Sequence, residues 1–536
     1  MNRVAGLAAK AALAYHRRRL WPLLRTRAGD PASAQRRTLL GILDQHASTS
    51  FGRAHSFAEV RDGGDYAAAV PVHDYEDLRP FIAEQQRTGE SVLTDEAPIL
   101  FARTSGTTGQ PKDIPVTASG LRRQAKAQRL LATMITRSTR VLGGRFLTVG
   151  SPAIEGHLPS GTPYGSASGM ILDAMPALMR RRYLITQEIS AVTDHDERYR
   201  AIALEGLAER EVTAIGSANP STFLRIRDAM RDDWESLLVD VGRRRLTRAR
   251  ELSRLDPHQL HLGDVWPDLA TITTWTGGSC AVALDRLRPW LPPTAELVEL
   301  GYTASELRGT VAPAPGRADC VPLLDDVYFE FVARSTWEDG GSDFQGLESL
   351  EVGAQYYVFI TTVDGLYRYD MNDILEVVGR YEETPTLAFV QKGRGVTTIT
   401  GEKLYESQLI DALRAVGSGS VPGAGFFLAL ADRERSTYDL YIEGPVYVDG
   451  SRASESELAI RVDDEISHRS VEYQAKRASK RLGPIEVHEL TPGAGDRYRE
   501  TCVARGQREA QFKILHLQYR DQCPVPMAAI IGDKRS

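Results

Sequence analysis

A short segment near residue 105 concentrates the residue types that bind phosphate. It contains one serine, two glycines and two threonines, with a lysine three residues later: Ser105, Gly106, Thr107, Thr108, Gly109 and Lys112. Glycines let backbone amides turn toward an anion, hydroxyls donate to phosphate oxygens, and lysine adds a mobile positive charge. Pro111 and Asp113 on either side of the lysine exclude a Walker A motif. A simple turn between a strand and a helix remains the alternative.

Two later segments could complete a nucleotide site. In the first, Tyr302 ends an apolar run and Glu306 follows four residues later, so a ring could stack on a purine and a carboxylate could hold Mg²⁺. In the second, residues 365–373 read as two strands around a tight polar turn that bears Asp370, Asn372 and Asp373. A fixed carboxylate there could accept the ribose hydroxyls. A strand-end tyrosine with a solvated glutamate, and an ordinary hairpin turn, are the alternatives.

Near the end of the chain, three further segments hold candidate residues. Arg394 lies between Gly393 and Gly395, residues 401–406 read Gly-Glu-Lys-Leu-Tyr-Glu, and Lys513 closes a Gln-Phe-Lys triplet. Two glycine turns indicate a hinge, and a C-terminal domain could carry Lys513 into a cleft. Glycine turns without a hinge and a surface lysine are the alternatives.

The elements that must position these residues follow an α/β pattern. Short apolar or β-branched runs alternate with amphipathic stretches, which predicts strands at 145–150, 212–217, 271–276 and 297–302 and helices at 197–210, 221–235 and 243–254. Thr117 is a predicted N-cap for a helix over 118–138, whose basic residues (Arg122, Arg123, Lys126 and Arg129) are expected to be solvated. Ligands of parallel sheets bind beyond the carboxyl ends of the strands, where the residue-105 and residue-302 segments fall.

These elements predict two domains. The first, residues 1–393, has parallel sheets flanked by helices and a β-barrel-like part at about 320–393, where the strands become closely spaced. The second, residues 394–536, is a smaller, mobile α+β domain within the usual domain size.

Composition restricts the class of protein. The 536-residue chain is 42% hydrophobic and 25% charged, as soluble globular proteins are, and its net charge of -6 gives no footprint for nucleic acid. Four scattered cysteines (Cys280, Cys320, Cys502 and Cys523) fit reduced thiols. An Ala/Leu-rich N-terminal stretch is interrupted by Lys10 and followed by arginines, which favours an amphipathic helix packed on the protein over a signal peptide, with contact to a membrane surface as the alternative. We therefore expect a cytoplasmic protein with no membrane partner, a monomer or a weak dimer.

Taken in order, the segments resemble a known family nearly from end to end. They resemble the adenylate-forming enzymes, and among these the acyl acid-amido synthetases of the auxin-responsive Gretchen Hagen family. Besides the segments above, the resemblance includes Tyr75–Pro80, Ala218–Ser221, Trp266–Leu269 and Trp275–Gly278.

The resemblance implies roles for individual residues. The residues of the 105–112 loop would grip the phosphates of ATP, Tyr302 would stack on adenine, Asp373 would hold the ribose and Glu306 would bind Mg²⁺. Other nucleotide contacts would come from Gly278, Thr303, Ser305, Phe389 and Arg394, and Lys513 would join Lys112 as a catalytic residue. Three segments depart from the family pattern: Arg103–Thr104 replaces two serines, Asn372 replaces a glycine, and Ile514–His516 replaces a run containing Pro-Arg.

The implied activity is ATP-dependent amide formation, in which an acid is adenylated, pyrophosphate leaves, and the amine of an amino acid then displaces AMP. A ligase that delivers the acyl group to coenzyme A and a non-catalytic nucleotide-binding homologue are the alternatives. Acyl pockets are apolar and defined by shape, so the sequence does not separate aryl, indolyl, jasmonate-like and aliphatic acids.

Overall fold

The computed structural model describes residues 3–104, 112–137, 140–393, 395–400, 402–417, 425–448, 450–505 and 514–531. The chain forms two compact units. One comprises Met1–Trp275 and Trp290–Phe389, and the other comprises Thr276–Pro289 and Val390–Ser536. The second unit therefore includes residues 276–289 from the middle of the chain. A single boundary at 393/394 does not describe this division.

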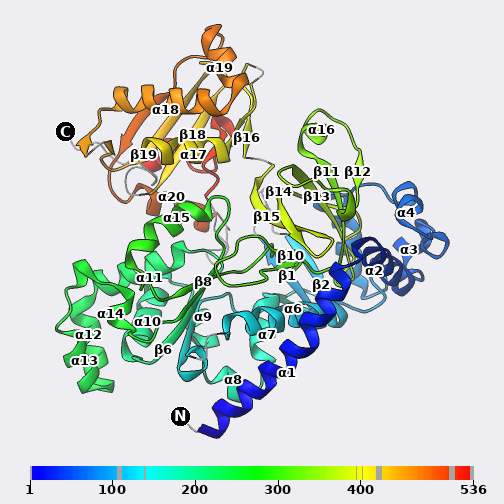
Figure 1. Ribbon diagram of the computed structural model, residues 1–536, viewed down its shortest axis with the longest axis horizontal. Coiled ribbons are helices and arrows are strands. Elements are labelled where there is room, and N and C mark those ends of the chain that lie inside the picture. Colours follow the sequence, from blue (N-terminus) through cyan, green and yellow to red (C-terminus); the bar gives the residue numbers. More distant parts are fainter. Residues whose placement is uncertain are drawn as a thin grey trace. The chain divides into compact units, whose positions relative to one another are not determined.

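A parallel sheet of four strands organises the middle of the first unit (Figure 1). Its order is β3 (Arg145–Thr148), β6 (Val212–Gly216), β7 (Thr271–Thr274) and β8 (Glu296–Glu299), and each neighbouring pair is parallel. The predicted strands and the parallel α/β class are confirmed. Helices α10 (His195–Ala208) and α11 (Ser221–Asp232) also lie where they were expected.

The helix predicted over 243–254 is instead the ends of two helices. The chain breaks at Arg245, whose φ of -148° and ψ of 82° are not helical, between α12 (Trp234–Arg244) and α13 (Leu246–Leu252). The amphipathic spacing of the sequence continues across Arg245, so the spacing does not reveal the break between the two helices.

A second, mixed sheet brackets the predicted phosphate loop. Its order is β2 (Lys112–Val116), β1 (Leu100–Thr104), β5 (Pro163–Gly165) and β4 (Ile154–His157). Strands β1 and β2 are antiparallel, and Thr104 pairs with Lys112. The residues between them, 105–111, thus connect two strands of a hairpin and not a strand and a helix. The predicted helix follows β2 as α6 (Ala118–Ile135), capped by Thr117 as expected.

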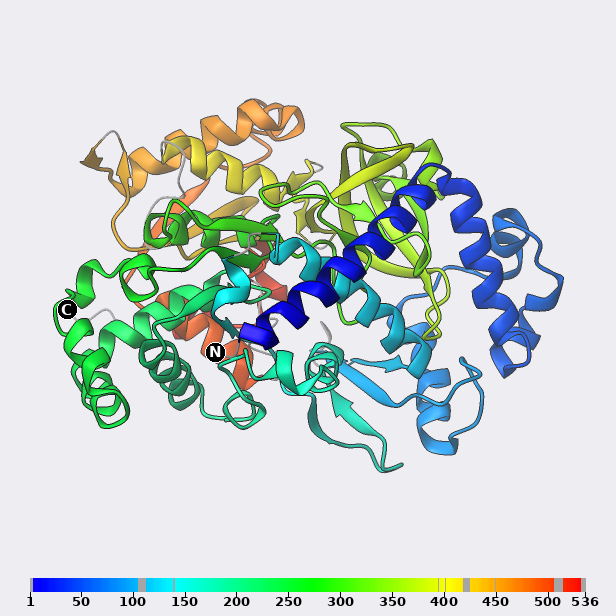
Figure 2. The same ribbon diagram turned by 60° about the horizontal axis from the view of Figure 1, so that its bottom comes forward.

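Helices from the N-terminus pack against several parts of the first unit. They are α1 (Arg3–Ala28), α2 (Pro31–His46), α3 (Ser50–Ala54), α4 (Gly63–Ala69) and α5 (Tyr75–Thr88). Figure 2 shows α1 as one long helix, which is joined to α6 by a 2.8 Å bond from Trp21 Nε1 to Thr133 Oγ1. In the described part of the chain, no helix is both long and apolar enough to cross a membrane.

The sequence predicts that the basic residues of α6 are solvated, but two of them have protein partners. Lys126 Nζ lies 3.2 Å from Asp326 Oδ1 and 3.7 Å from Asp325 Oδ2. Arg123 Nη1 donates to the carbonyl oxygens of both aspartates, at 3.0 and 3.2 Å. These residues fasten α6 to the chain entering the next sheet, 200 residues away in sequence.

The third sheet of this unit is antiparallel and follows at 327–392. Its order is β12 (Phe344–Gln345), β11 (Val327–Ala333), β13 (Gln355–Thr362), β14 (Tyr369–Tyr381) and β15 (Thr384–Lys392). This is the closely spaced strand region predicted as barrel-like, and its strand order has two ends, β12 and β15. Phe329, Phe331, Val358 and Ile360 are nearly inaccessible and build the core on one side of it.

Strand β14 contains a large bulge where a turn was predicted. Tyr357 pairs with Ile374 and Phe359 pairs with Asp370, so Met371–Asp373 lie opposite Val358 alone. Asn372 has a φ of 50°, in the left-handed region that glycine prefers and asparagine tolerates better than most residues. Asp370, Asn372 and Asp373 therefore belong to a bulge inside one strand.

A buried ion pair supports the chain just before this bulge. Arg368, whose φ is 43°, donates from Nε to both carboxylate oxygens of Glu330 at 3.1 and 3.0 Å. Its Nη1 also donates to the carbonyl of Val70 at 3.0 Å. The two charged side chains are only 5% and 6% exposed. Because water is excluded there, the attraction between the two charges offsets the cost of burying them.

The second unit has its own mixed sheet. Its order is β22 (Glu486–Leu490), β19 (Thr437–Glu443), β18 (Phe427–Asp432) and β23 (Leu517–Tyr519), in which only the central pair is antiparallel. Its core includes residues of α17 (Glu406–Val416), α18 (Glu455–Arg469) and α19 (Val471–Ala478), and a second cluster includes α20 (Ala494–Ala504) and α21 (Met527–Ile531).

Helix α15 (Cys280–Leu287) belongs to this unit through two contacts. Val282 is part of the core that contains α17 and α18, and Asp285 accepts an ion pair from Arg414 at 2.9 Å. These contacts explain why residues 276–289 belong to the second unit, although the residues on both sides of them in sequence belong to the first.

Removing the positive charge from the Arg368–Glu330 pair should destabilise the first unit strongly. Arg368→Met would leave Glu330 buried without its cation, and we expect unfolding to become easier by about 3–5 kcal/mol. Arg368→Met/Glu330→Leu, which removes both charges, should recover a large part of that loss. Arg25→Ala, which breaks the exposed pair with Glu382, should cost less than about 1 kcal/mol. Urea denaturation measures all three, and equal stability of the Arg368 and Arg25 variants would contradict this account.

Candidate active site

Two of the predicted nucleotide contacts, 71 residues apart in sequence, meet through a buried hydrogen bond. The hydroxyl of Tyr302, which follows β8, donates to Asp373 Oδ2 in the β14 bulge at 2.7 Å. Tyr302 is 8% exposed and Asp373 is 4% exposed. Burial, and then the negative charge of Asp373, raise the pKa of Tyr302 well above its usual value, so the hydroxyl keeps its proton. The bond fixes the orientation of the carboxylate.

The backbone around Tyr302 is adapted to this position. Gly301 has a φ of 81°, and a Cβ at this position would lie 2.5 Å from the carbonyl oxygen of Thr310. The amide of Tyr302 donates to Thr310 Oγ1 at 2.8 Å. Phe389 of β15 presents a ring nearly parallel to that of Tyr302, with 6.4 Å between the centroids and 13° between the planes. A tyrosine that follows β8 and a phenylalanine of the antiparallel sheet thus lie side by side.

Lys112 lies between two tyrosines at the start of β2. Its Nζ donates to the hydroxyl of Tyr369 at 3.3 Å and lies 5.2 Å from the ring centroid of Tyr75. The Tyr75 hydroxyl accepts the amide proton of Asp113 at 2.6 Å, and burial raises the pKa of Tyr75 to about 12. Tyr369 is 2% exposed, so the hydroxyl that accepts from Lys112 belongs to a buried side chain.

Glu306 lies close enough to Tyr302 and Tyr369 to change the pKa of each. After burial, its negative charge is the largest cause that raises the pKa of Tyr369, and it also contributes to the raised pKa of Tyr302. The segment that carries it is a hairpin in which the amide of Ala304 donates to the carbonyl of Leu307. Thr303 Oγ1 accepts the indole proton of Trp275 at 3.1 Å. Thr303, Ser305 and Glu306 are all partly exposed.

The other predicted site residues divide into two groups. Ser105, Gly106, Thr107, Thr108, Gly109, Arg394 and Lys513 lie outside the described residues. Gly278 is described, with a φ of 57°, and belongs to the second unit. The structure therefore brings together Lys112, Tyr302, Glu306, Asp373 and Phe389 in the first unit.

The sequence motifs alone give no role to several residues that build this site. Tyr75 and Tyr369 flank Lys112, and Trp275 binds Thr303. All three lie inside segments that carry the family resemblance, and this is the sequence feature from which a role in the site could be predicted.

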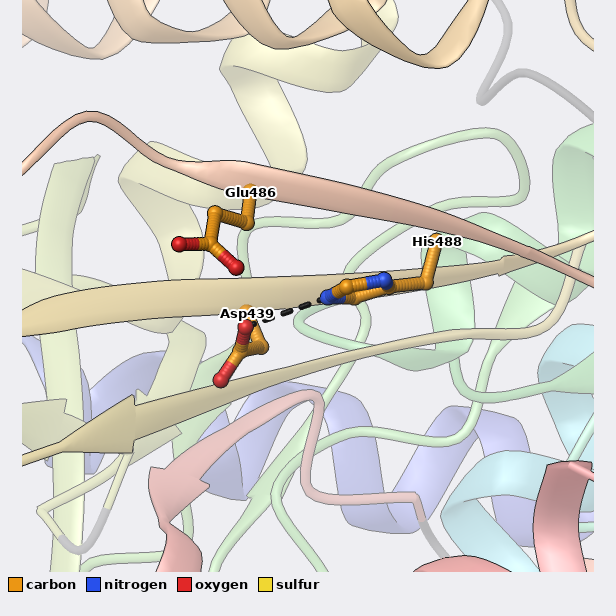
Figure 3. A group of neighbouring side chains, drawn as sticks. All are labelled: Asp439, Glu486 and His488. Carbon is orange, nitrogen blue, oxygen red and sulfur yellow. Dashed lines mark hydrogen bonds and ion pairs between the residues drawn. The ribbon is translucent and has the colours of Figure 1, made fainter. Parts of the chain in front are cut away.

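The second unit contains another group of possible metal ligands, Asp439, Glu486 and His488 (Figure 3). His488 Nε2 lies 3.1 Å from Asp439 Oδ1. However, Arg435 and Arg520 both bond to the other oxygen of Asp439, and Arg435 also pairs with Glu486 at 3.0 Å. Two guanidinium groups already neutralise these carboxylates, so the group is an ion-pair network that joins β19 and β22.

Just after the Lys513 segment, His516 is buried in the second unit. It is 2% exposed, its ring stacks on Phe427 with 4.0 Å between centroids, and its Nδ1 lies 2.7 Å from the carbonyl oxygen of Phe427. Its amide donates to Glu406 Oε1 at 2.5 Å. The chain therefore enters β23 through a histidine packed in the core.

The fold is shared with that of adenylate-forming ligases: 2-hydroxyisobutyryl-CoA ligase in complex with 2-HIB-AMP superposes with a TM-score of 0.57 at 14% identity, covering 92% of each chain. A solved GH3.15 acyl acid amido synthetase is more similar in fold, with a TM-score of 0.79 at 21% identity over 95% of this chain and 94% of its own.

The family models match most of the sequence. The GH3 family N-terminal domain matches residues 24–295, the central domain 320–392 and the C-terminal domain 407–521. The chain belongs to the GH3 family, and the resemblance to the Gretchen Hagen enzymes is confirmed.

Curated relatives carry the same family name. Indole-3-acetic acid-amido synthetase GH3.17 of Arabidopsis thaliana is 24% identical, covering 89% of this chain and 90% of its own length. The probable indole-3-acetic acid-amido synthetase GH3.4 of Oryza sativa subsp. japonica is also 24% identical, covering 95% and 89%.

Acid should weaken the second unit through His516. Burial lowers the pKa of His516 from 6.5 to about 4 in the folded chain, so between these values the unfolded chain binds a proton that the folded chain does not. Stability should therefore fall as the pH drops from about 6.5 to about 4, by up to about 3 kcal/mol.

His516→Asn, whose amide can still donate to Phe427, should flatten this pH dependence. His468→Asn, at an exposed position in α18, should leave it unchanged. Denaturation curves between pH 4 and pH 8 measure the slopes, and equal slopes for wild type and His516→Asn would contradict the assignment.

Proposed function

We propose that this protein is an ATP-dependent amide ligase that joins a small-molecule carboxylic acid to the amine of an amino acid and forms AMP. It is a ligase of the acyl acid-amido synthetase class. The supporting observation is the hydrogen bond between Tyr302 and Asp373, because it fixes a buried carboxylate beside two parallel aromatic rings. Such a pair of groups suits a nucleoside, whose base needs an apolar face and whose ribose needs a hydrogen-bond acceptor.

Each described residue then has one task. Tyr302 and Phe389 offer ring faces to adenine, with Thr303 and Ser305 at the edge of the nucleotide, and Asp373 accepts the ribose hydroxyls. Lys112 offsets the charge of the leaving pyrophosphate. We propose that the loop Ser105–Gly109 also binds phosphate, that Gly278 and Arg394 contact the nucleotide, and that Lys513 acts from the C-terminal domain.

The proposed metal is Mg²⁺, and Glu306 fits it. Mg²⁺ in nucleotide sites is commonly held by one or two carboxylates and the substrate phosphates, and Glu306 is a partly exposed carboxylate near Tyr369, the tyrosine that Lys112 contacts. When bound, the ion neutralises charge on the phosphate oxygens.

The reaction proceeds in two steps. In the first, a carboxylate oxygen attacks the α-phosphorus of ATP, the bond to pyrophosphate breaks, and an acyl-adenylate forms. Lys112 stabilises the negative charge that develops on the leaving group, and Asp373 and Tyr302 hold the nucleotide in line. In the second step the amine attacks the acyl carbon, AMP leaves with the electrons of the broken bond, and the amine loses a proton. A rotation of the C-terminal domain between the steps is part of the proposal.

A thioester-forming ligase is the second candidate, because the fold is shared with 2-hydroxyisobutyryl-CoA ligase. AMP release with an acid and a panel of amino acids, compared with the same acid and coenzyme A, separates the two. The relatives are named for indole-3-acetic acid, and one GH3.15 structure holds 2,4-DB. We accordingly propose a small organic acid as the acyl substrate, and a library of acids tested by mass spectrometry would identify it.

Lys112→Ala and Asp373→Ala should each lower acid-dependent pyrophosphate exchange by at least about 100-fold, because each removes a group that acts on charge or on nucleotide position. Both variants should remain folded; Lys112→Ala should melt near the wild-type temperature, and Asp373→Ala should melt lower because it leaves the buried Tyr302 hydroxyl without its acceptor. Two matched changes, Lys476→Ala in α19 and Asp343→Ala at an exposed loop position, should leave exchange unchanged. Normal exchange in the Lys112 or Asp373 variant would refute the role of that residue, and its absence in the wild type with every acid of the library would refute the function.

A further inference from the structure

Arg308 stands at a defined place in the hairpin that carries Thr303 and Glu306. Thr303 and Arg308 form an isolated antiparallel bridge. The bonds on either side of this pair run from the amide of Ala304 to Leu307 at 2.8 Å and from the amide of Gly309 to Tyr302 at 2.9 Å. Residues opposite each other in such a pair project from the same face, and their side chains are close. The side chain of Arg308 therefore leaves the hairpin beside that of Thr303.

That face lies at the mouth of the parallel sheet. Thr303 Oγ1 accepts the indole proton of Trp275, which directly follows β7, while the hairpin itself follows β8. Both are carboxyl ends of parallel strands, where ligands of such sheets bind. Arg308 thus projects from the ligand-binding edge of the first unit, next to the segment of Tyr302 and Glu306.

The guanidinium of Arg308 has no protein partner among the residues that the structure describes. By contrast, Arg103 of the same unit pairs with Asp113 at 2.8 Å, and Arg368 pairs with Glu330. Arg308 is only partly exposed, and burial lowers its pKa to about 10. A desolvated cation without a counter-ion is unfavourable, and a bound anion would remove that cost.

We propose that Arg308 binds a substrate carboxylate that stays ionised throughout the reaction. This inference rests on the proposed amide ligase function. The group is either the α-carboxylate of the amino-acid acceptor or a second carboxylate on the acyl acid.

The chemistry of the reaction argues against other anions. The reacting carboxylate loses its charge when it becomes an acyl-adenylate, so a fixed cation would favour the substrate over that intermediate. The phosphates already have Lys112. An arginine fork, by contrast, matches a persistent carboxylate with two parallel hydrogen bonds.

The test compares substrate pairs that differ only in one charge. The acceptor arm measures AMP release with each of the twenty amino acids and with their carboxamides. The acid arm measures pyrophosphate exchange, which needs no acceptor, with hexanoate, adipate and adipate monoamide. Wild type, Arg308→Gln, Arg308→Lys and the surface variant Arg231→Gln are compared, and melting temperatures show whether each variant is folded.

In one arm, Arg308→Gln should raise the KM of the substrate that carries the extra carboxylate by about 10- to 100-fold and leave the KM of the analogue without that carboxylate unchanged. Arg308→Lys should recover part of this loss, and Arg231→Gln should behave as wild type. An effect in the acceptor arm shows that Arg308 binds the α-carboxylate of the amino acid. An effect in the acid arm shows that it binds the second carboxylate of a dicarboxylic acid.

A folded, active Arg308→Gln enzyme with wild-type discrimination in both arms would overturn the inference, as would a raised KM for MgATP alone. If Arg308→Gln does not fold, Arg308→Met takes its place under the same criteria. Absence of exchange in the wild type with every acid would instead overturn the proposed function, and the inference with it.

Discussion

The constraint on which this site depends is the bulge in β14. Three residues, Met371–Asp373, must fit opposite one residue of β13. Asn372 within the bulge and Arg368 just before β14 both lie in the left-handed region, which costs free energy unless the surroundings hold these residues in place. Arg368 is held by its buried bond to Glu330, and Asp373 by the hydroxyl of Tyr302. Without the bulge, Asp373 would continue the alternation of an ordinary strand and would not have the same position.

The bulge matters because it connects three sheets. Tyr302 comes from the carboxyl end of the parallel sheet, Asp373 and Tyr369 from the antiparallel sheet, and Lys112 from the mixed sheet. Tyr369 begins β14 and binds Lys112, while Asp373, four residues later, binds Tyr302. One strand therefore sets the position of a cation and of a carboxylate that are 261 residues apart in sequence. This shared support explains how segments far apart in the chain can form one nucleotide site.

Much of this could be predicted, because the signals were local. Short β-branched runs with glycine or serine at their ends located β3, β6, β7 and β8, and Thr117 marked the start of α6. The ordered motifs indicated the family. The missed features depend on partners that are distant in sequence. No local pattern shows that β2 pairs with β1, that Lys126 binds Asp326, or that residues 371–373 form a bulge and not a turn. Likewise, Arg308 is notable only because the structure describes no partner for it.

The central claim is that the bulge presents Asp373 to the ribose of ATP. Calorimetry with MgATP and with its 2′,3′-dideoxy analogue tests this directly, in wild type and in Asp373→Ala. We predict that wild type binds MgATP at least about tenfold more tightly than the analogue, because charge-assisted hydrogen bonds are lost, and that Asp373→Ala binds both equally. Equal affinity of the wild type for the two nucleotides, or an undiminished preference in Asp373→Ala, would contradict the account.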